Sequence, residues 1–162
     1  MVTAISPHTE SHIIDFKNTM LTKKAYYAFQ ALTHLVERYK QGPVLISEIS
    51  LERKIPLKFL ENILLELKNA GILDSKKGKG GGYYLRNDPA ETRMATVFRI
   101  IDGPISMLPC VSLYFYRKCD NCNENFCGLH HTLEKVRDAT LAILENSTLA
   151  DLVIKDKNPI LG

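Results

Sequence analysis

The chain has 162 residues, of which 45% are hydrophobic and 24% are charged, and this composition is typical of one globular domain with a substantial core. It contains no apolar run near the roughly 20 residues that cross a bilayer. Its first residues lack the cationic and apolar regions of a signal peptide. We therefore exclude disordered, fibrous and membrane-spanning classes, and expect a soluble cytoplasmic protein that does not bind membranes.

Basic charge is concentrated in one part of the chain. Residues 20 to 99 hold 14 lysines and arginines against 8 acidic residues, a net charge of +6 within a chain of net charge +3. This bias favours a polyanionic partner, and scattered lysines on a solvated surface are the alternative. Residues 1 to 19 show no period, so we expect a flexible N-terminal extension there.

Helical spacing of apolar residues begins just after this extension. Thr22 is expected to cap a first helix that Gly42-Pro43 closes. The apolar face of that helix comprises Ala25, Ala28, Phe29, Leu32, Leu35, Val36 and Tyr39. This spacing predicts one long buried face.

Two further helices are predicted in close succession. Ser47 is a candidate N-cap of a short helix that carries Ile49 and Leu51, and it is also a candidate DNA-binding residue. Pro56 begins a second helix after a turn, and Gly71 supplies its left-handed stop. The apolar stripe of the second helix is Leu60, Ile63, Leu64 and Leu67. Such a pair is a helix-turn-helix, and its second helix is suited to a DNA major groove.

Two short strands, Ile72 to Lys76 and Gly82 to Arg86, are expected directly after the second helix. The loop between them is rich in glycine and lysine, which suits close contact with a phosphate backbone. Its lysines are Lys76, Lys77 and Lys79. A basic hairpin in this position is typical of a winged helix, and a flexible solvated loop is the alternative.

The run CDNCNENFCGLHH contains a possible metal site. Its candidate ligands have the spacing C-x2-C-x4-C-x2-H and are Cys119, Cys122, Cys127 and His130. Cys110, nine residues upstream, is an alternative ligand. In a reducing cytosol, four cysteines within 18 residues favour metal binding or thiol chemistry over structural disulfides.

A last long helix is predicted from Gly128. Its apolar stripe is Leu129, Leu133, Val136, Thr140, Ile143 and Leu144. We expect this face to pack on a second copy of the chain, and packing onto the chain's own first helix is the alternative.

Several motifs together resemble those of a known family: LTKKAYYAFQAL, RKIPLKFLENILLELKNAGIL, SKKGKGGGYYL, VFRIIDG and TLADLV. They are similar to the bacterial winged-helix regulators typified by the iron-sulfur cluster regulator IscR, with its nitric-oxide-sensing (NsrR) and cysteine-metabolism (CymR) relatives. The resemblance implies a homodimeric repressor or activator of transcription that binds double-stranded DNA. It also implies a [2Fe-2S] cluster in the cysteine loop, and CGLH matches the end of the family's ligand motif.

The resemblance assigns further roles to individual residues. Recognition-helix contacts fall on Lys58, Phe59 and Glu61, with Phe59 as a core residue and Glu61 as a solvated charge being the alternatives. The cationic position of the wing falls on Lys77, where relatives often have arginine. Because lysine lacks the planar fork of arginine, we expect Lys77 to contact phosphate.

The expected fold is mainly α with a small β-hairpin, a winged helix-turn-helix domain plus a long C-terminal dimerisation helix. We place the DNA-binding domain at 20–103, a cysteine-rich sensor loop at 104–127, the dimerisation helix at 128–153 and a tail at 154–162.

Three interpretations of the cysteine cluster stay open: a [2Fe-2S] sensor, a structural zinc site and a metal-free thiol switch. The spacing of Cys119 and Cys122 is shorter than in the family, so Cys110 replaces one of them in an alternative ligand set. No phosphate-binding loop, nucleophile elbow or paired carboxylates are found, so we do not expect an enzyme. The remaining alternatives are a protein-interaction module and, less favoured, an oxidoreductase that uses Cys119 and Cys122.

Overall fold

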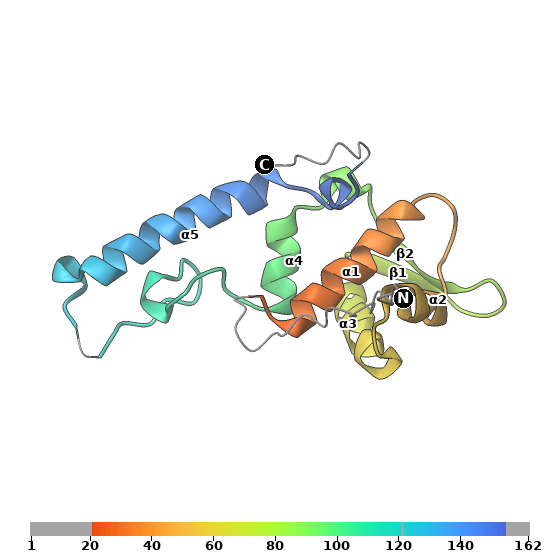
Figure 1. Ribbon diagram of the computed structural model, residues 1–162, viewed down its shortest axis with the longest axis horizontal. Coiled ribbons are helices and arrows are strands. Elements are labelled where there is room, and N and C mark those ends of the chain that lie inside the picture. Colours follow the sequence, from red (N-terminus) through yellow and green to blue (C-terminus); the bar gives the residue numbers. More distant parts are fainter. Residues whose placement is uncertain (1–20, 121, 155–162) are drawn as a thin grey trace, which may run out of the picture.

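The computed structural model describes residues 21–120 and 122–154, and these form a mainly α-helical protein with one β-hairpin (Figure 1). The extension at 1–19 and residues 155–162 of the expected tail lie outside the described residues. Among those described, no helix has both the length and the apolar character needed to cross a bilayer.

Helix α1 (Lys23–Glu37) begins where the sequence predicts. The hydroxyl of Thr22 accepts a hydrogen bond from the backbone N–H of Ala25, which satisfies one free donor of the first turn. The helix ends at Glu37, before the expected stop at Gly42-Pro43, and a turn with Lys40 at φ 66° follows. Most of the predicted apolar face is confirmed, because it is buried or packs against the core.

The helix-turn-helix consists of α2 (Ile46–Arg53) and α3 (Leu57–Asn69). Ser47 is not the N-cap of α2: that prediction is wrong, since the cap lies two residues earlier, at Leu45, which makes no side-chain hydrogen bond. Ile49 is buried, but Leu51 is 79% exposed. Two residues along a helix rotate a side chain by about 200°, so these two side chains point to different sides.

Helix α3 follows its predicted pattern closely. Its buried residues are Leu60, Ile63, Leu64 and Leu67, as predicted. Gly71 adopts the expected left-handed conformation at φ 80° after the helix ends. Between α2 and α3, Lys54 is also left-handed, and the Ser50 hydroxyl donates to the carbonyl of Ile55 at 2.7 Å. This side-chain bond holds the tight turn that directs α3 away from α2.

The wing hairpin joins β1 (Leu73–Lys76) and β2 (Gly82–Leu85) in antiparallel register, with Leu73 opposite Leu85. Val44 forms an isolated bridge to β2, because its backbone exchanges two 2.9 Å hydrogen bonds with Tyr83. Gly82 makes this approach possible. A Cβ atom on Gly82 would lie 2.1 Å from the Val44 carbonyl oxygen, and its φ of 145° is in the left-handed half of the map.

Helix α4 (Met94–Ile101) packs against α3, and α5 (Gly128–Asn146) projects away from the helical body (Figure 1). The α-helical part of the expected 128–153 range ends at Asn146. A short 3-10 turn, Leu149–Leu152, then packs back on the domain: Leu149 is fully buried and donates its N–H to the carbonyl of Thr92 at 2.9 Å. The C-terminal end of α5 is therefore fixed to the helical body that contains α1 to α4.

Candidate DNA-binding surface and cysteine-rich site

The N-terminal end of α3 is the exposed end of the helix-turn-helix. The Lys58 side chain is 90% exposed and its Nζ lies 3.3 Å from Oε2 of Glu61. Phe59 is 41% exposed, and its ring meets that of Tyr27 edge-on with centroids 5.7 Å apart. Ser47 is exposed on α2, which packs against α3. Phe59 is thus partly anchored on α1, while Lys58 and Glu61 form a solvated pair that a ligand can rearrange.

The wing loop places its three lysines in solvent. Lys76, Lys77 and Lys79 are all exposed, and the loop extends beyond the helical body at the end of the molecule opposite to the start of α5 (Figure 1). The turn is tight, because a Cβ atom on Gly81 would lie 2.4 Å from the Lys76 carbonyl oxygen. A protruding basic loop of this kind fits the phosphate backbone of a nucleic acid.

The four cysteines come together around the start of α5. Cys127 is the N-cap of this helix, and its Sγ accepts a hydrogen bond from the backbone N–H of His130 at 3.4 Å. The thiol of Cys122 is hydrogen-bonded to Cys119 and to Cys127. Cys110 is buried on a 3-10 turn. Its thiol pKa is raised, mainly by this burial and to a smaller extent by the nearby Cys119. Cys122 therefore lies beside both Cys119 and Cys127, and Cys110 lies near Cys119 and Cys127.

The thiol of Cys122 is held in its protonated form. Its pKa is raised to about 12, first by the hydrogen bond with Cys119, then by burial and by the other cysteine contacts. The neighbouring sulfurs disfavour a further negative charge on Cys122.

A second donor set lies at the same site and includes a residue that the sequence reasoning missed. One ligand atom from each of Cys110, Glu124 and His130 lies within 4.8 Å of the others. The carboxylate of Glu124 accepts from the Tyr116 hydroxyl at 2.9 and 3.0 Å. The sequence did contain a signal for Glu124: its carboxylate lies three residues before Cys127, within a run of residues that can bind metals.

His130 gives an independent indication of a ligand. Its side chain is largely buried, and Nδ1 has no hydrogen-bond partner among the described residues, while Nε2 lies 3.6 Å from Oε1 of Glu134. A buried nitrogen without a partner is unfavourable unless something binds it. Sulfur, imidazole and carboxylate donors together suit zinc or iron, so the residues present fit a metal ion or cluster.

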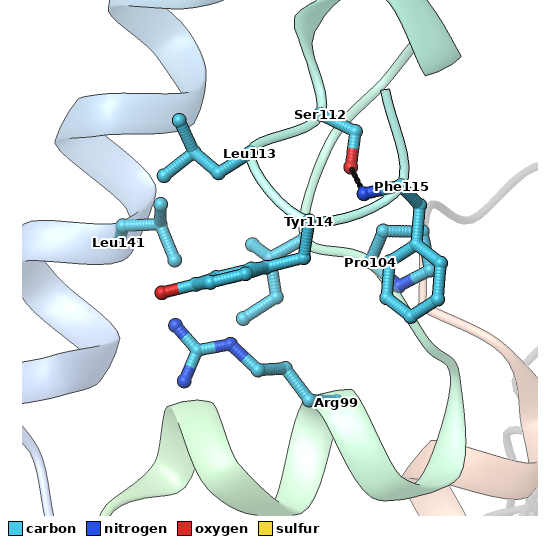
Figure 2. Close-up of a pocket in the computed structure, with 8 residues that line it drawn as sticks. Arg99, Pro104, Ser112, Leu113, Tyr114, Phe115 and Leu141 are labelled. Atoms are coloured by element: carbon cyan, nitrogen blue, oxygen red, sulfur yellow. Dashed lines mark hydrogen bonds between the residues drawn. The ribbon is translucent and has the colours of Figure 1, made fainter. Parts of the chain in front are cut away.

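The cysteine-rich segment, residues 104–127, is attached to the rest of the molecule through α4 and α5. Figure 2 shows the Tyr114 ring over the guanidinium of Arg99 on α4, beside a cavity of about 340 Å³ that Leu141 of α5 also lines. Arg99 Nη2 lies 2.5 Å from Oε1 of Glu145. Arg137 of α5 donates from Nη1 to the carbonyl of Val111 at 2.6 Å. These contacts connect the segment to both neighbouring helices.

Comparisons with known proteins agree with this arrangement. The family model Rrf2, described as an iron-dependent transcriptional regulator, matches residues 21–155. An rrf2-like helix-turn-helix regulator from Rhodobacter capsulatus is 36% identical over 83% of this chain and 92% of its own length. The regulator IscR from Serratia proteamaculans is 31% identical over 82% of this chain and 78% of its own length.

Solved structures show the same fold. CymR of B. subtilis, the global cysteine regulator, superposes with a TM-score of 0.69 at 24% identity, over 83% of this chain and 95% of its own. IscR of T. potens gives a TM-score of 0.65 at 25% identity, over 83% of this chain and 86% of its own. The predicted winged-helix fold and family resemblance are confirmed, and these relatives are transcriptional regulators rather than enzymes. The chain therefore belongs to the Rrf2 family of DNA-binding transcriptional regulators.

Proposed function

We propose that this protein is a homodimeric regulator whose affinity for DNA is set by a [2Fe-2S] cluster in the cysteine-rich segment. The observation that carries the proposal is the meeting of the four cysteines and Glu124 of the cysteine-rich segment with His130 of α5, whose Nδ1 has no hydrogen-bond partner among the described residues. The family's description as iron-dependent and the likeness to IscR proteins support it.

The DNA contacts are divided between α3 and the wing. Lys58, Phe59 and Glu61 occupy the exposed end of α3, which has the shape and position of a recognition helix in a major groove. Lys77 and its neighbours in the wing supply cations to the backbone or the adjacent minor groove. Base preference then comes mainly from α3, and salt-dependent affinity mainly from the wing.

The candidate cluster ligands come from both ends of the segment. They are Cys119, Cys122, Cys127 and His130, with Cys110 and Glu124 as further donors at the same place. When bound, a [2Fe-2S] cluster supplies a redox-sensitive charge and four bonds that order its ligand loop. Cys127 and His130 fix the site to the start of α5, and Cys110 lies on the 3-10 turn Pro109–Val111, which also packs against α5. The contact of the segment with α4 is made by Tyr114. The protein's residues thereby link loop order to helix position.

Two other occupants remain as second candidates, each with its own observation. The close approach of Cys110, Glu124 and His130 suits a single zinc ion. The hydrogen bond between Cys119 and Cys122 brings two thiols near each other, which suits a thiol switch in a metal-free protein. The metal and sulfide content of protein purified without oxygen separates all three.

The second protomer is proposed to pack along α5. Ile143 and Leu129 are 67% and 60% exposed on this projecting helix, and an apolar stripe on a helix is rarely left in water. A two-fold dimer presents two copies of α3 to a palindromic operator.

DNA binding is tested with a duplex recovered from a random-sequence library. Substituting Lys77→Ala and Lys79→Ala together is expected to reduce the slope of log affinity against log salt by about 1.8 per subunit, since each lost phosphate contact removes about 0.9. Lys135→Ala, which removes an exposed charge from α5, is the control and leaves the slope unchanged. An unchanged slope in the double variant would exclude the wing from DNA binding.

A further inference from the structure

A second cationic surface lies on the face of the wing hairpin that is turned away from the core. Alternation along the strands places the buried Leu73 and Leu85 on one face and the exposed Lys76 and Tyr84 on the other. Lys76, Tyr84 and the turn after α1, together with the apolar Val44 and Leu85 at the hairpin edge, line a hollow of about 430 Å³. Its cations are Arg38, Lys40, Lys76 and Arg86, and we call this site the basic hollow.

The positive charge of the basic hollow is only partly neutralised. Arg38 Nη2 lies 3.2 Å from Oε1 of Glu48, and Arg86 Nε lies 3.1 Å from Oδ2 of Asp74. For the lysines Lys40 and Lys76, no carboxylate of the described residues lies within salt-bridge distance. Four cations therefore face two carboxylates, which leaves an attraction for an anion that spans the hollow.

Lys40 is held in a defined position. Its backbone is left-handed at φ 66°, a conformation that costs a residue with a side chain about 1 kcal/mol. Its Nζ lies 5.1 Å from the centroid of the Tyr39 ring, so the ring keeps the ammonium group beside the hollow. The ammonium therefore loses less freedom on binding than a lysine in open solvent.

We propose that the basic hollow binds the phosphate backbone of duplex DNA just outside the half-site that α3 and the wing contact, an inference that rests on the proposed DNA binding. Lys76 belongs to both the wing and the hollow, so a duplex held by the wing loop continues past the outer face of the hairpin. DNA presents one negative charge for about every 1.7 Å of its axis. The hollow then adds affinity without sequence preference, because phosphate contacts do not distinguish bases.

The test compares two duplexes: the shortest library-selected duplex that binds with sequence preference, and the same duplex lengthened by one helical turn, about ten base pairs, at each end. The parent chain is expected to bind the longer duplex more tightly and with a steeper salt dependence. Lys40→Gln is expected to reduce the salt slope on the longer duplex by about 0.9 per subunit and to leave the shorter one unchanged. Lys40→Glu is expected to reduce the salt slope on the longer duplex further than Lys40→Gln does.

The control is Lys135→Gln, which removes one exposed charge far from the wing and is expected to match the parent on both duplexes. If Lys40→Gln binds the longer duplex with the same affinity and salt slope as the parent, the basic hollow does not contact flanking DNA. The same conclusion follows if the variant loses equal affinity for the shorter and the longer duplex. If the parent chain shows no preference for any duplex in the library, the proposed DNA binding itself fails. Thermal unfolding of each variant shows that the fold is kept.

Discussion

The ring of Tyr114 lies over the guanidinium group of Arg99, with 5.5 Å between the ring centroid and Cζ (Figure 2). Tyr114 belongs to the cysteine-rich segment, and Arg99 belongs to α4, which packs against the recognition helix α3. Through this pair, the cysteine-rich segment is in direct contact with the DNA-binding domain, so a change in the segment can affect that domain. The cluster can alter DNA affinity only through contacts that differ between the loaded and the cluster-free protein, and this pair is a candidate for such a contact.

Tyr114→Ala is expected to weaken this connection without abolishing DNA binding. Tyr114 is 73% exposed, so the cation–π contact contributes only about 0.5–1 kcal/mol. The ratio of DNA affinities between cluster-loaded and cluster-free protein should fall by about two- to fivefold. Phe126→Ala, which removes an exposed aromatic side chain of the same segment, is the control. An unchanged ratio in Tyr114→Ala would assign the coupling to another contact.

Gly82→Ala is expected to destabilise the wing. The new methyl group meets the Val44 carbonyl oxygen at 2.1 Å, and the positive φ adds backbone strain. The free energy of unfolding should fall by at least about 2 kcal/mol in urea melts. Gly128→Ala is the matched control, because it has neither a positive φ nor an atom within 4 Å of the added Cβ. Equal melts for both variants would show that the Val44 bridge does not require glycine.

Ile143→Asp is expected to convert the protein to monomers. Ile143 is 67% exposed in the single chain, so the substitution leaves the protomer intact and acts on a partner that covers the residue. Light scattering should report half the parent mass, with unchanged circular dichroism. If Ile143→Asp keeps the mass of the parent protein, this part of α5 does not belong to the dimer interface.

Cys122 is expected to resist alkylation in the metal-free, reduced protein. Hydrogen bonding to Cys119 raises its pKa to about 12, so little thiolate is present at pH 8, whereas the denatured chain titrates near about 8.5. Because the folded pKa lies above the unfolded one, the contribution to stability is complete below about pH 8.5 and is lost as the pH rises towards 12. The rate of Cys122 alkylation is measured as a function of pH by peptide mass spectrometry. Labelling of Cys122 at pH 7 as fast as in denaturant would contradict the thiol network.

The helix-turn-helix and the wing were readable from the sequence because local patterns determine them. The stripe of α3, the stop at Gly71 and the two strands of the wing all follow from spacing and glycine placement. The start of α2 was misplaced because Ser47 is a good cap by type, while tertiary packing of Ile49 sets where the helix begins. Residue type alone does not decide between neighbouring cap positions.

The cysteine-rich site was only partly readable. The spacing identified Cys127 and His130, which share one turn of α5. It did not identify Glu124, and it left Cys110 as an alternative, because their approach depends on how a segment with little regular structure folds back. Contacts of this kind depend on long-range packing and carry no periodic signal.

The most direct test of the account is the affinity of one anaerobic preparation for its selected duplex before and after the cluster is removed by a chelator and oxidant. We predict brown protein with iron and acid-labile sulfide in equal amounts, and an affinity that changes by about 5- to 150-fold on removal. Cys127→Ala should be colourless and should bind DNA as the cluster-free parent does. Colourless parent protein with stoichiometric zinc and no sulfide, or a cluster whose loss leaves the affinity unchanged, would contradict the account.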